Sequence, residues 1–119
     1  MPSDFVTREL LFALAGSVTA ALLLRTAADP AAGWPVGLGA AIVAATTLGV
    51  ADNLGRRPAF GLVGLVGATA VGLVLFTYPP EVASVAAGMI GMNVGWALER
   101  VVFGLVRPVP EPRLARERA

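Results

Sequence analysis

Four long apolar segments, separated by short polar or proline-containing turns, limit what this sequence can fold into more than any other feature. A helix needs about 20 apolar residues to cross the hydrocarbon core of a bilayer. Of the 119 residues, 56% are hydrophobic and 14% are charged, which is more apolar surface than a soluble protein of this size can bury. We therefore expect an all-α integral membrane protein in the cell membrane, surrounded by the lipid bilayer. Its predicted membrane spans cover about residues 8–25, 35–52, 59–78 and 82–106.

Prolines and polar residues mark the limits of these segments. Pro35 and Pro58 are placed to open helices, because proline is tolerated in the first turn, and the prolines at 79–80 force a break. The simplest arrangement is a single transmembrane domain over residues 1–107, a compact four-transmembrane-helix up-down bundle. Residues 108–119 are polar and rich in proline and arginine, and we expect a flexible charged tail there. A second interpretation makes the first segment a cleaved signal peptide, which would leave three spans.

The arginines predict the orientation in the membrane. The chain contains no lysine, and its nine basic residues are all arginines. With four spans, Arg25 lies alone on one side. Positive residues favour the cytoplasmic side, so a multi-pass protein with both termini in the cytoplasm is predicted. The arginines on that side are Arg8, Arg56, Arg57, Arg107, Arg113, Arg116 and Arg118.

Small residues recur every fourth position in the predicted helices, which places them on one helix face. Gly91 and Gly95 belong to a GxxxG pattern in the fourth segment, and Gly64, Ala68 and Gly72 form a similar stripe in the third. Such stripes let helix backbones approach closely in lipid, where no hydrophobic force draws helices together. We expect these residues to pack helices within the chain, within a homo-oligomer, or against another membrane protein.

A shift of 50 residues aligns the small stripe of the second segment with that of the fourth. Gly37 then falls on Ala87, and Gly49 falls on Glu99. An alternative description of the fold is therefore two tandem helical hairpins in the same orientation.

Polar residues converge where the small stripes reach the predicted cytoplasmic end. If the stripes face the axis of the bundle, a possible ion or proton site is formed by Glu99, Glu9, Arg56 and Asn53, with Asp52, Arg57 and Arg100 beside them. Charged residues at this depth more commonly mark the edge of the hydrocarbon or pair with each other. A desolvated Glu99 could instead carry a proton or bind a cation.

Several function classes are excluded by residues that the chain lacks. It contains no cysteine and no histidine, which removes thiolate chemistry and the commonest metal ligand and general base, so we expect no catalytic residues, no metal and no cofactor. The net charge of +1 predicts no nucleic-acid partner. We expect a non-enzymatic structural or accessory subunit that assembles through small-residue helix faces. The alternative is a small homo-oligomeric proton- or ion-coupled transporter or channel that uses Glu99.

Overall fold

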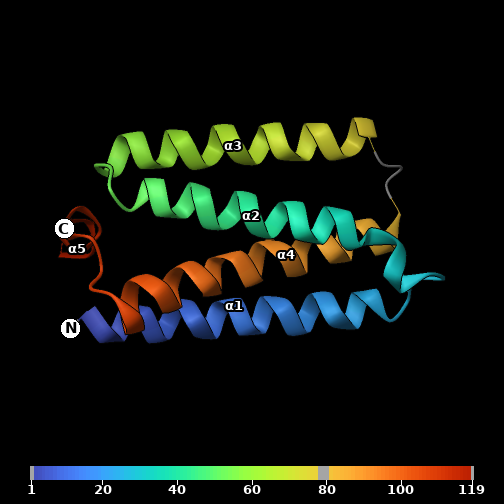
Figure 1. The fold of residues 1–119 in the computed structure, drawn as a ribbon, viewed down its shortest axis with the longest axis horizontal. Helices are drawn as coiled ribbons and strands as arrows, with labels where there is room; N and C mark the ends of the chain where they lie inside the picture. Colours follow the sequence, from blue (N-terminus) through green and yellow to red (C-terminus); the bar gives the residue numbers. More distant parts are fainter. Residues whose placement is uncertain (1, 78–80, 119) are drawn as a thin grey trace.

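The computed structural model describes residues 2–77 and 81–118, and this part of the chain contains helices and turns but no β-strand (Figure 1). Two short segments adjoin the longer helices: the 3₁₀ helix η1 precedes α2, and η2 follows α4 with a kink at Phe103, whose backbone angles (φ −104°, ψ 52°) are not helical. The elements in chain order are α1 (Pro2–Leu24), η1 (Pro30–Gly33), α2 (Trp34–Ala51), α3 (Arg56–Thr77), α4 (Val82–Val101), η2 (Val102–Val106) and α5 (Glu111–Arg118).

Three of these helical segments are long and apolar enough to cross a membrane. They are Asp4–Leu24, Pro30–Ala51 and Val82–Val106. In α3 the apolar stretch found among the described side chains is Arg57–Leu73, and the side chains of residues 74–77 lie outside the described part of the structure. The last residue of the predicted third span, Tyr78, lies outside the described residues. An all-helical protein with three helices of membrane-spanning length is thus established, and the four-span arrangement stays a prediction.

The helix limits follow the prolines closely in the second and fourth segments. Pro35 lies in the first turn of α2, and α4 together with η2 covers the predicted residues 82–106. The first helix begins earlier than the apolar run, at Pro2. Hydropathy locates the hydrocarbon and not the helix, so polar residues with an acidic first turn can extend α1 beyond it.

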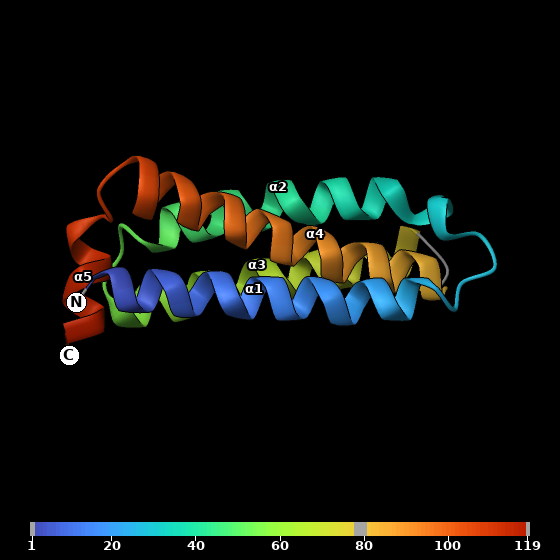
Figure 2. The ribbon, with the colours of Figure 1, turned by 90° about the horizontal axis from the view of Figure 1, so that it is seen from below.

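The helices lie side by side in the order α1, α4, α2, α3 (Figures 1 and 2). The last long helix, α4, is therefore central: it packs on α1 along one side and most extensively on α2 along the other. The colours in Figure 1 show that α2 and α4 run in the same direction. In a regular up-down bundle these two helices would be diagonal partners, but here they make the closest contact.

Small residues explain why α2 and α4 approach so closely. A Cβ atom added to Gly91 would meet the carbonyl oxygen of Gly37, and one added to Gly95 would meet the carbonyl oxygen of Ala41. Because a backbone oxygen cannot rotate away as a side chain can, only glycine fits at these two positions of α4. The pairing of α2 with α4 therefore depends on residues without side chains on one side of the contact.

The small stripe of α3 faces open space within this chain. A Cβ added to Gly64 or Gly72 would have no neighbour within 4 Å, and Ala68 is exposed. Helix α3 packs mainly on α2 and lies at the outer edge of the row (Figure 1). The stripe that we expected to pack helices thus makes no such contact among the described residues.

Two glycine contacts fix α1 against α4. Gly16 leaves room for the side chain of Asn93. The Nδ2 of Asn93 donates a hydrogen bond of 2.7 Å to the carbonyl of Met89 in the same helix. Near the other end, a Cβ on Gly104 of η2 would lie 3.1 Å from the methyl groups of Val6. These contacts bring the start of α1 beside the end of α4, where the charged residues gather.

Candidate functional site

Arg100, near the end of α4, is the centre of a buried group of charges. Its Nε lies 2.8 Å from Glu9 Oε2, and its Nη2 lies 2.7 Å from both Asp52 Oδ2 and Glu99 Oε2. Nη1 also donates a hydrogen bond of 3.4 Å to the carbonyl of Phe103. The side chain is 1% exposed. One guanidinium therefore joins carboxylates from α1, from the end of α2 and from its own helix.

Glu9 connects α1 to two further elements. Its Oε2 accepts a hydrogen bond of 3.0 Å from Trp96 Nε1 in α4, and its Oε1 pairs with Arg113 Nη2 of α5. Trp96 lies one helical turn before Arg100, so the indole and the guanidinium reach the same carboxylate. The two oxygens of Glu9 thus face different partners, one within the long helices and one on α5.

The two oxygens of Asp52, at the end of α2, also face different partners. Its Oδ2 faces Arg100, and its Oδ1 lies 3.3 Å from Arg116 Nη2 and 3.6 Å from Arg113 Nη1. Arg116 Nη1 donates to the carbonyl of Ala51 at 2.8 Å and to that of Leu54 at 3.4 Å. The last carbonyls of a helix lack partners within it and attract cations, so α5 completes the C-terminus of α2.

Phe5 provides the apolar surface against which the arginines lie. The Cζ atoms of Arg100 and Arg113 lie 5.5 Å and 5.1 Å from the centroid of its ring. Phe5 precedes Glu9 by four residues, so the ring and the carboxylate occupy one face of α1. Both distances are within the range of a cation–π interaction.

The charges in this group balance. We call it the ion-pair cluster, and it contains the carboxylates of Glu9, Asp52 and Glu99 and the guanidinium groups of Arg100, Arg113 and Arg116. All three carboxylates are buried, and the α5 arginines are 16% exposed. One acceptor is left over: Glu99 Oε1 is buried and has no hydrogen-bond partner among the residues described.

The four residues predicted to form an ion or proton site are distributed as follows. Glu9 and Glu99 meet at Arg100, as described above. Asn53 is exposed, and its Nδ2 donates 2.9 Å to the carbonyl of Gly49 in the preceding helix. Arg56 begins α3, and its side chain lies outside the described part of the structure. The structure therefore brings the two glutamates together and places Asn53 at the surface.

Sequence reasoning did not assign Phe5, Arg113 or Arg116 to the site. The segment predicted to be a flexible tail contains α5, and its two arginines lie against Glu9 and Asp52. A local signal for this helix was present in Glu111 and Pro112, because an acidic residue and a proline are both favoured in a first turn. The partners of α5 could not be found in this way, since they lie 64 and 104 residues away.

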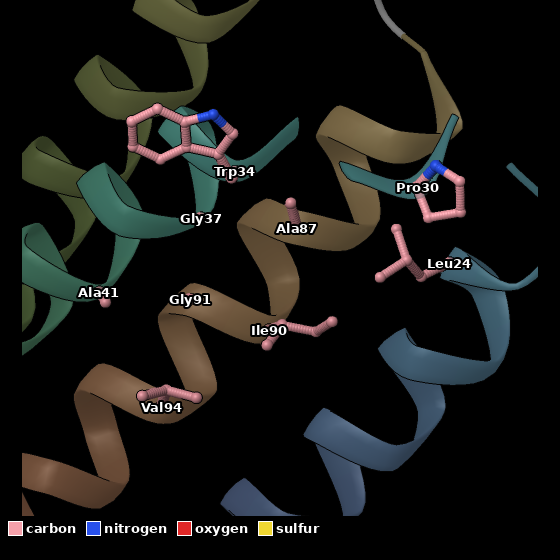
Figure 3. A pocket seen from close by; sticks show the side chains of 9 residues that line it. All are labelled: Leu24, Pro30, Trp34, Gly37, Ala41, Ala87, Ile90, Gly91 and Val94. Carbon is pink, nitrogen blue, oxygen red and sulfur yellow. The ribbon is translucent and has the colours of Figure 1, made fainter. Parts of the chain in front are cut away.

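An apolar groove lies at the opposite end of the helices (Figure 3). It has a volume of ≈310 Å³ and is open along one side, between α1, α2 and α4. Its lining is almost wholly apolar, so the groove has no charged group to orient a polar substrate. The lining residues are Leu24, Pro30, Trp34, Gly37, Ala41, Ala87, Ile90, Gly91 and Val94.

Within residues 2–77 and 81–118, no group of three acidic side chains is arranged to hold a metal ion. The carboxylates of the ion-pair cluster face arginines instead. Comparison of this chain with protein-family models, with curated proteins and with solved structures found no match.

Proposed function

We propose that this chain is a multi-pass protein of the cell membrane that acts as a non-enzymatic structural or accessory subunit. In this proposal α1, α2, α3 and α4 all cross the bilayer, and both termini face the cytoplasm. The uneven distribution of the arginines supports that orientation, because seven arginines lie in loops or near span ends on the predicted cytoplasmic side and Arg25 alone lies on the other side.

The outer face of α3 is the observation on which the proposal chiefly rests. Gly61, Gly64, Gly67 and Gly72 all have open space where a side chain would be, whereas Gly91 and Gly95 of α4 already contact α2. Small residues promote close helix contacts in lipid. An α3 face with this composition and no neighbour in its own chain is suited to a helix from another subunit.

The ion-pair cluster supports an assembly role over transport. A transporter needs a carboxylate that exchanges protons or ions with water, but Glu9 and Asp52 each have arginine partners on two sides and are buried. Such an arrangement holds helix ends in register. Breaking a buried pair costs about 3–5 kcal/mol, so the cluster resists rearrangement.

Native mass spectrometry of the complex extracted gently from its own membrane tests this proposal. We expect a complex that contains a second membrane protein or a second copy of the chain. Gly64→Leu should disrupt that complex because it fills the α3 face. Gly39→Leu is the matched control, since Gly39 on α2 also has nothing within 4 Å in this chain.

A monomer of the unmodified chain would contradict the proposal. Equal loss of the complex in Gly64→Leu and Gly39→Leu would also contradict it, because the α3 face would then have no particular part in assembly.

One observation favours the alternative, a small homo-oligomeric proton- or ion-coupled transporter or channel. Glu99 Oε1 is buried without a hydrogen-bond partner in the described part of the chain, so this oxygen is available to a proton or cation. Flux through liposomes that contain the purified chain would distinguish the two functions. A flux that Glu99→Gln abolishes supports transport, and the absence of flux in both chains supports the assembly role.

A further inference from the structure

We propose that Phe5, Glu9 and Asp52 form a binding site for a guanidinium group, which Arg113 of the same chain occupies in this structure. The site is built from two helices that end beside each other, α1 and α2. Glu9 Oε1 and Asp52 Oδ1 both face α5, while the second oxygen of each carboxylate is engaged by Arg100. Arg100 thus engages one oxygen of each carboxylate, and the other oxygen of each faces α5.

The chemistry of the site favours guanidinium over other cations. A planar guanidinium can bind two separate oxygens along its edge while its face lies on an aromatic ring, and an ammonium group cannot do both. Arg113 makes part of this combination: Nη2 is hydrogen-bonded to Glu9, Nη1 lies at an ion-pair distance of 3.6 Å from Asp52 Oδ1, and Cζ lies 5.1 Å from the Phe5 centroid.

The charges show that the site requires a cation. Without α5, the carboxylates of Glu9, Asp52 and Glu99 would share Arg100 as their one guanidinium partner in the cluster. Glu99 is 4% exposed, and its Oε1 remains without a hydrogen-bond donor even with α5 in place. Uncompensated buried charge is strongly unfavourable, so removal of Arg113 favours either protonation of a carboxylate or binding of another cation at this site.

The occupant belongs to α5, a helix of eight residues near the end of the described chain. Residues 107–110 connect α5 to η2, and Arg113 and Arg116 of α5 contact Glu9 and the end of α2. The N-terminus and α5 lie together at one end of the molecule (Figures 1 and 2). A guanidinium group from outside can therefore replace Arg113 without disturbing the packing of α1, α2 and α4.

This site does not depend on the proposed assembly role. A guanidinium group can come from a small molecule or from an arginine of another polypeptide, and the recognition chemistry is the same for both.

Chemical rescue of Arg113→Ala in the full-length chain tests the site. The substitution removes the guanidinium and leaves its space, and methylguanidinium is the probe that should fill it. Trp96 reports binding because its indole donates to Glu9. Trp34→Phe removes the only other tryptophan, so the emission then comes from Trp96 alone.

We expect methylguanidinium to change the Trp96 emission in Arg113→Ala with saturation, at concentrations well below the molar range in which guanidinium denatures proteins. The concentration of methylammonium that gives the same change in Trp96 emission should be about tenfold higher, because methylammonium lacks the planar pair of donors. Phe5→Leu in the same background should weaken methylguanidinium binding about threefold through loss of the ring. Arg107→Ala is the control, because Arg107 is exposed and lies outside the cluster.

Arg113→Lys keeps the charge and so protects the fold if the alanine variant is unstable. Methylguanidinium should also alter Trp96 emission in this chain, at lower concentrations than in the chain that retains Arg113. Equal responses to methylguanidinium, methylammonium and sodium chloride at matched ionic strength would overturn the proposal. So would an equal response in Arg113→Lys and in the chain that retains Arg113.

The source of the guanidinium is resolved by a second ligand, N-acetylarginine amide. Tighter binding than that of methylguanidinium would indicate an arginine of a polypeptide, and weaker binding would indicate a small molecule. Failure of both ligands to bind would overturn the site itself.

Discussion

The guanidinium of Arg100 lies within ion-pair distance of three carboxylates at once. Its Nε and Nη2 reach oxygens of Glu9, Asp52 and Glu99, and the remaining Nη1 is 3.4 Å from a backbone carbonyl. A lysine could supply the same charge but not donors in fixed directions. The position therefore demands arginine for its geometry as well as for its charge.

Arg100→Gln should destabilise the protein by about 3–5 kcal/mol, because it leaves three buried carboxylates without their common partner. Arg100→Lys should fall between this variant and the unmodified chain. Unfolding in detergent micelles measures the differences. Arg107→Gln should stay within about 0.5 kcal/mol, because that side chain is exposed. Similar effects of the substitutions at positions 100 and 107 would show that the cluster adds no stability.

Helical spacing predicted part of the cluster and could not predict the rest. It placed Glu9 and Glu99 at one end of the helices because their positions continue the small stripes. It could not supply Arg113, since nothing local to α5 shows that Glu9, 104 residues earlier, is its partner. Pairing across such a distance is determined by tertiary packing, and sequence periodicity carries no information about it.

Helices α2 and α4 show how small residues can override the usual order of a bundle. They run in the same direction and are separated in the chain by the whole of α3, yet they form the closest pair (Figure 1). Contact between the backbones at Gly37 and Gly91 makes this possible. As a result α3 is displaced to the edge of the row.

Gly91→Ala should destabilise the α2–α4 pair by about 1–3 kcal/mol, because the added methyl group meets the carbonyl oxygen of Gly37. Gly95→Ala should act similarly through Ala41. Gly64→Ala is the matched control and should be neutral in the isolated chain, since its Cβ would meet nothing within 4 Å. Unfolding of the three variants under the same conditions measures the effect, and equal stabilities would argue against the close contact.

The sequence predicted the elements better than their arrangement. Prolines defined α2 and α4 closely, because proline restricts the backbone locally. Helix α1 begins at Pro2, ahead of the apolar run, because hydropathy reports the apolar segment and not the full length of the helix. The outward position of α3 was also not predicted, because its glycine stripe resembles that of α4 and only the tertiary contacts distinguish them.

The whole molecule separates charge from apolar surface along its length. The start of α1 and the helix α5, which contribute to the ion-pair cluster, lie at one end (Figure 1), and the apolar groove lies at the other (Figure 3). Large apolar side chains such as Phe12, Leu65 and Leu98 are exposed along the helices between these ends. This distribution suits a molecule whose long sides contact lipid.

The proposed orientation can be tested with single cysteines, because the chain contains none of its own. Gly55→Cys and Ala28→Cys introduce exposed thiols in the turns at opposite ends of the molecule. With a membrane-impermeant maleimide added to intact cells, Ala28→Cys should react and Gly55→Cys should react only after permeabilisation. The reverse pattern would invert the proposed topology, and reaction of both in intact cells would contradict membrane insertion.

The hydrogen bond between Glu9 and Arg113 also has a consequence for the order of folding. Ribosomes make the chain from its N-terminus, so Glu9 and Asp52 are synthesised long before Arg100, Arg113 and Arg116. A nascent chain that ends before α4 carries two carboxylates and none of the arginines that pair with them in the finished molecule. Helix α5, synthesised last, supplies the partner of Glu9 in α1, which is synthesised first. Native packing of the ion-pair cluster must therefore follow the synthesis of α5.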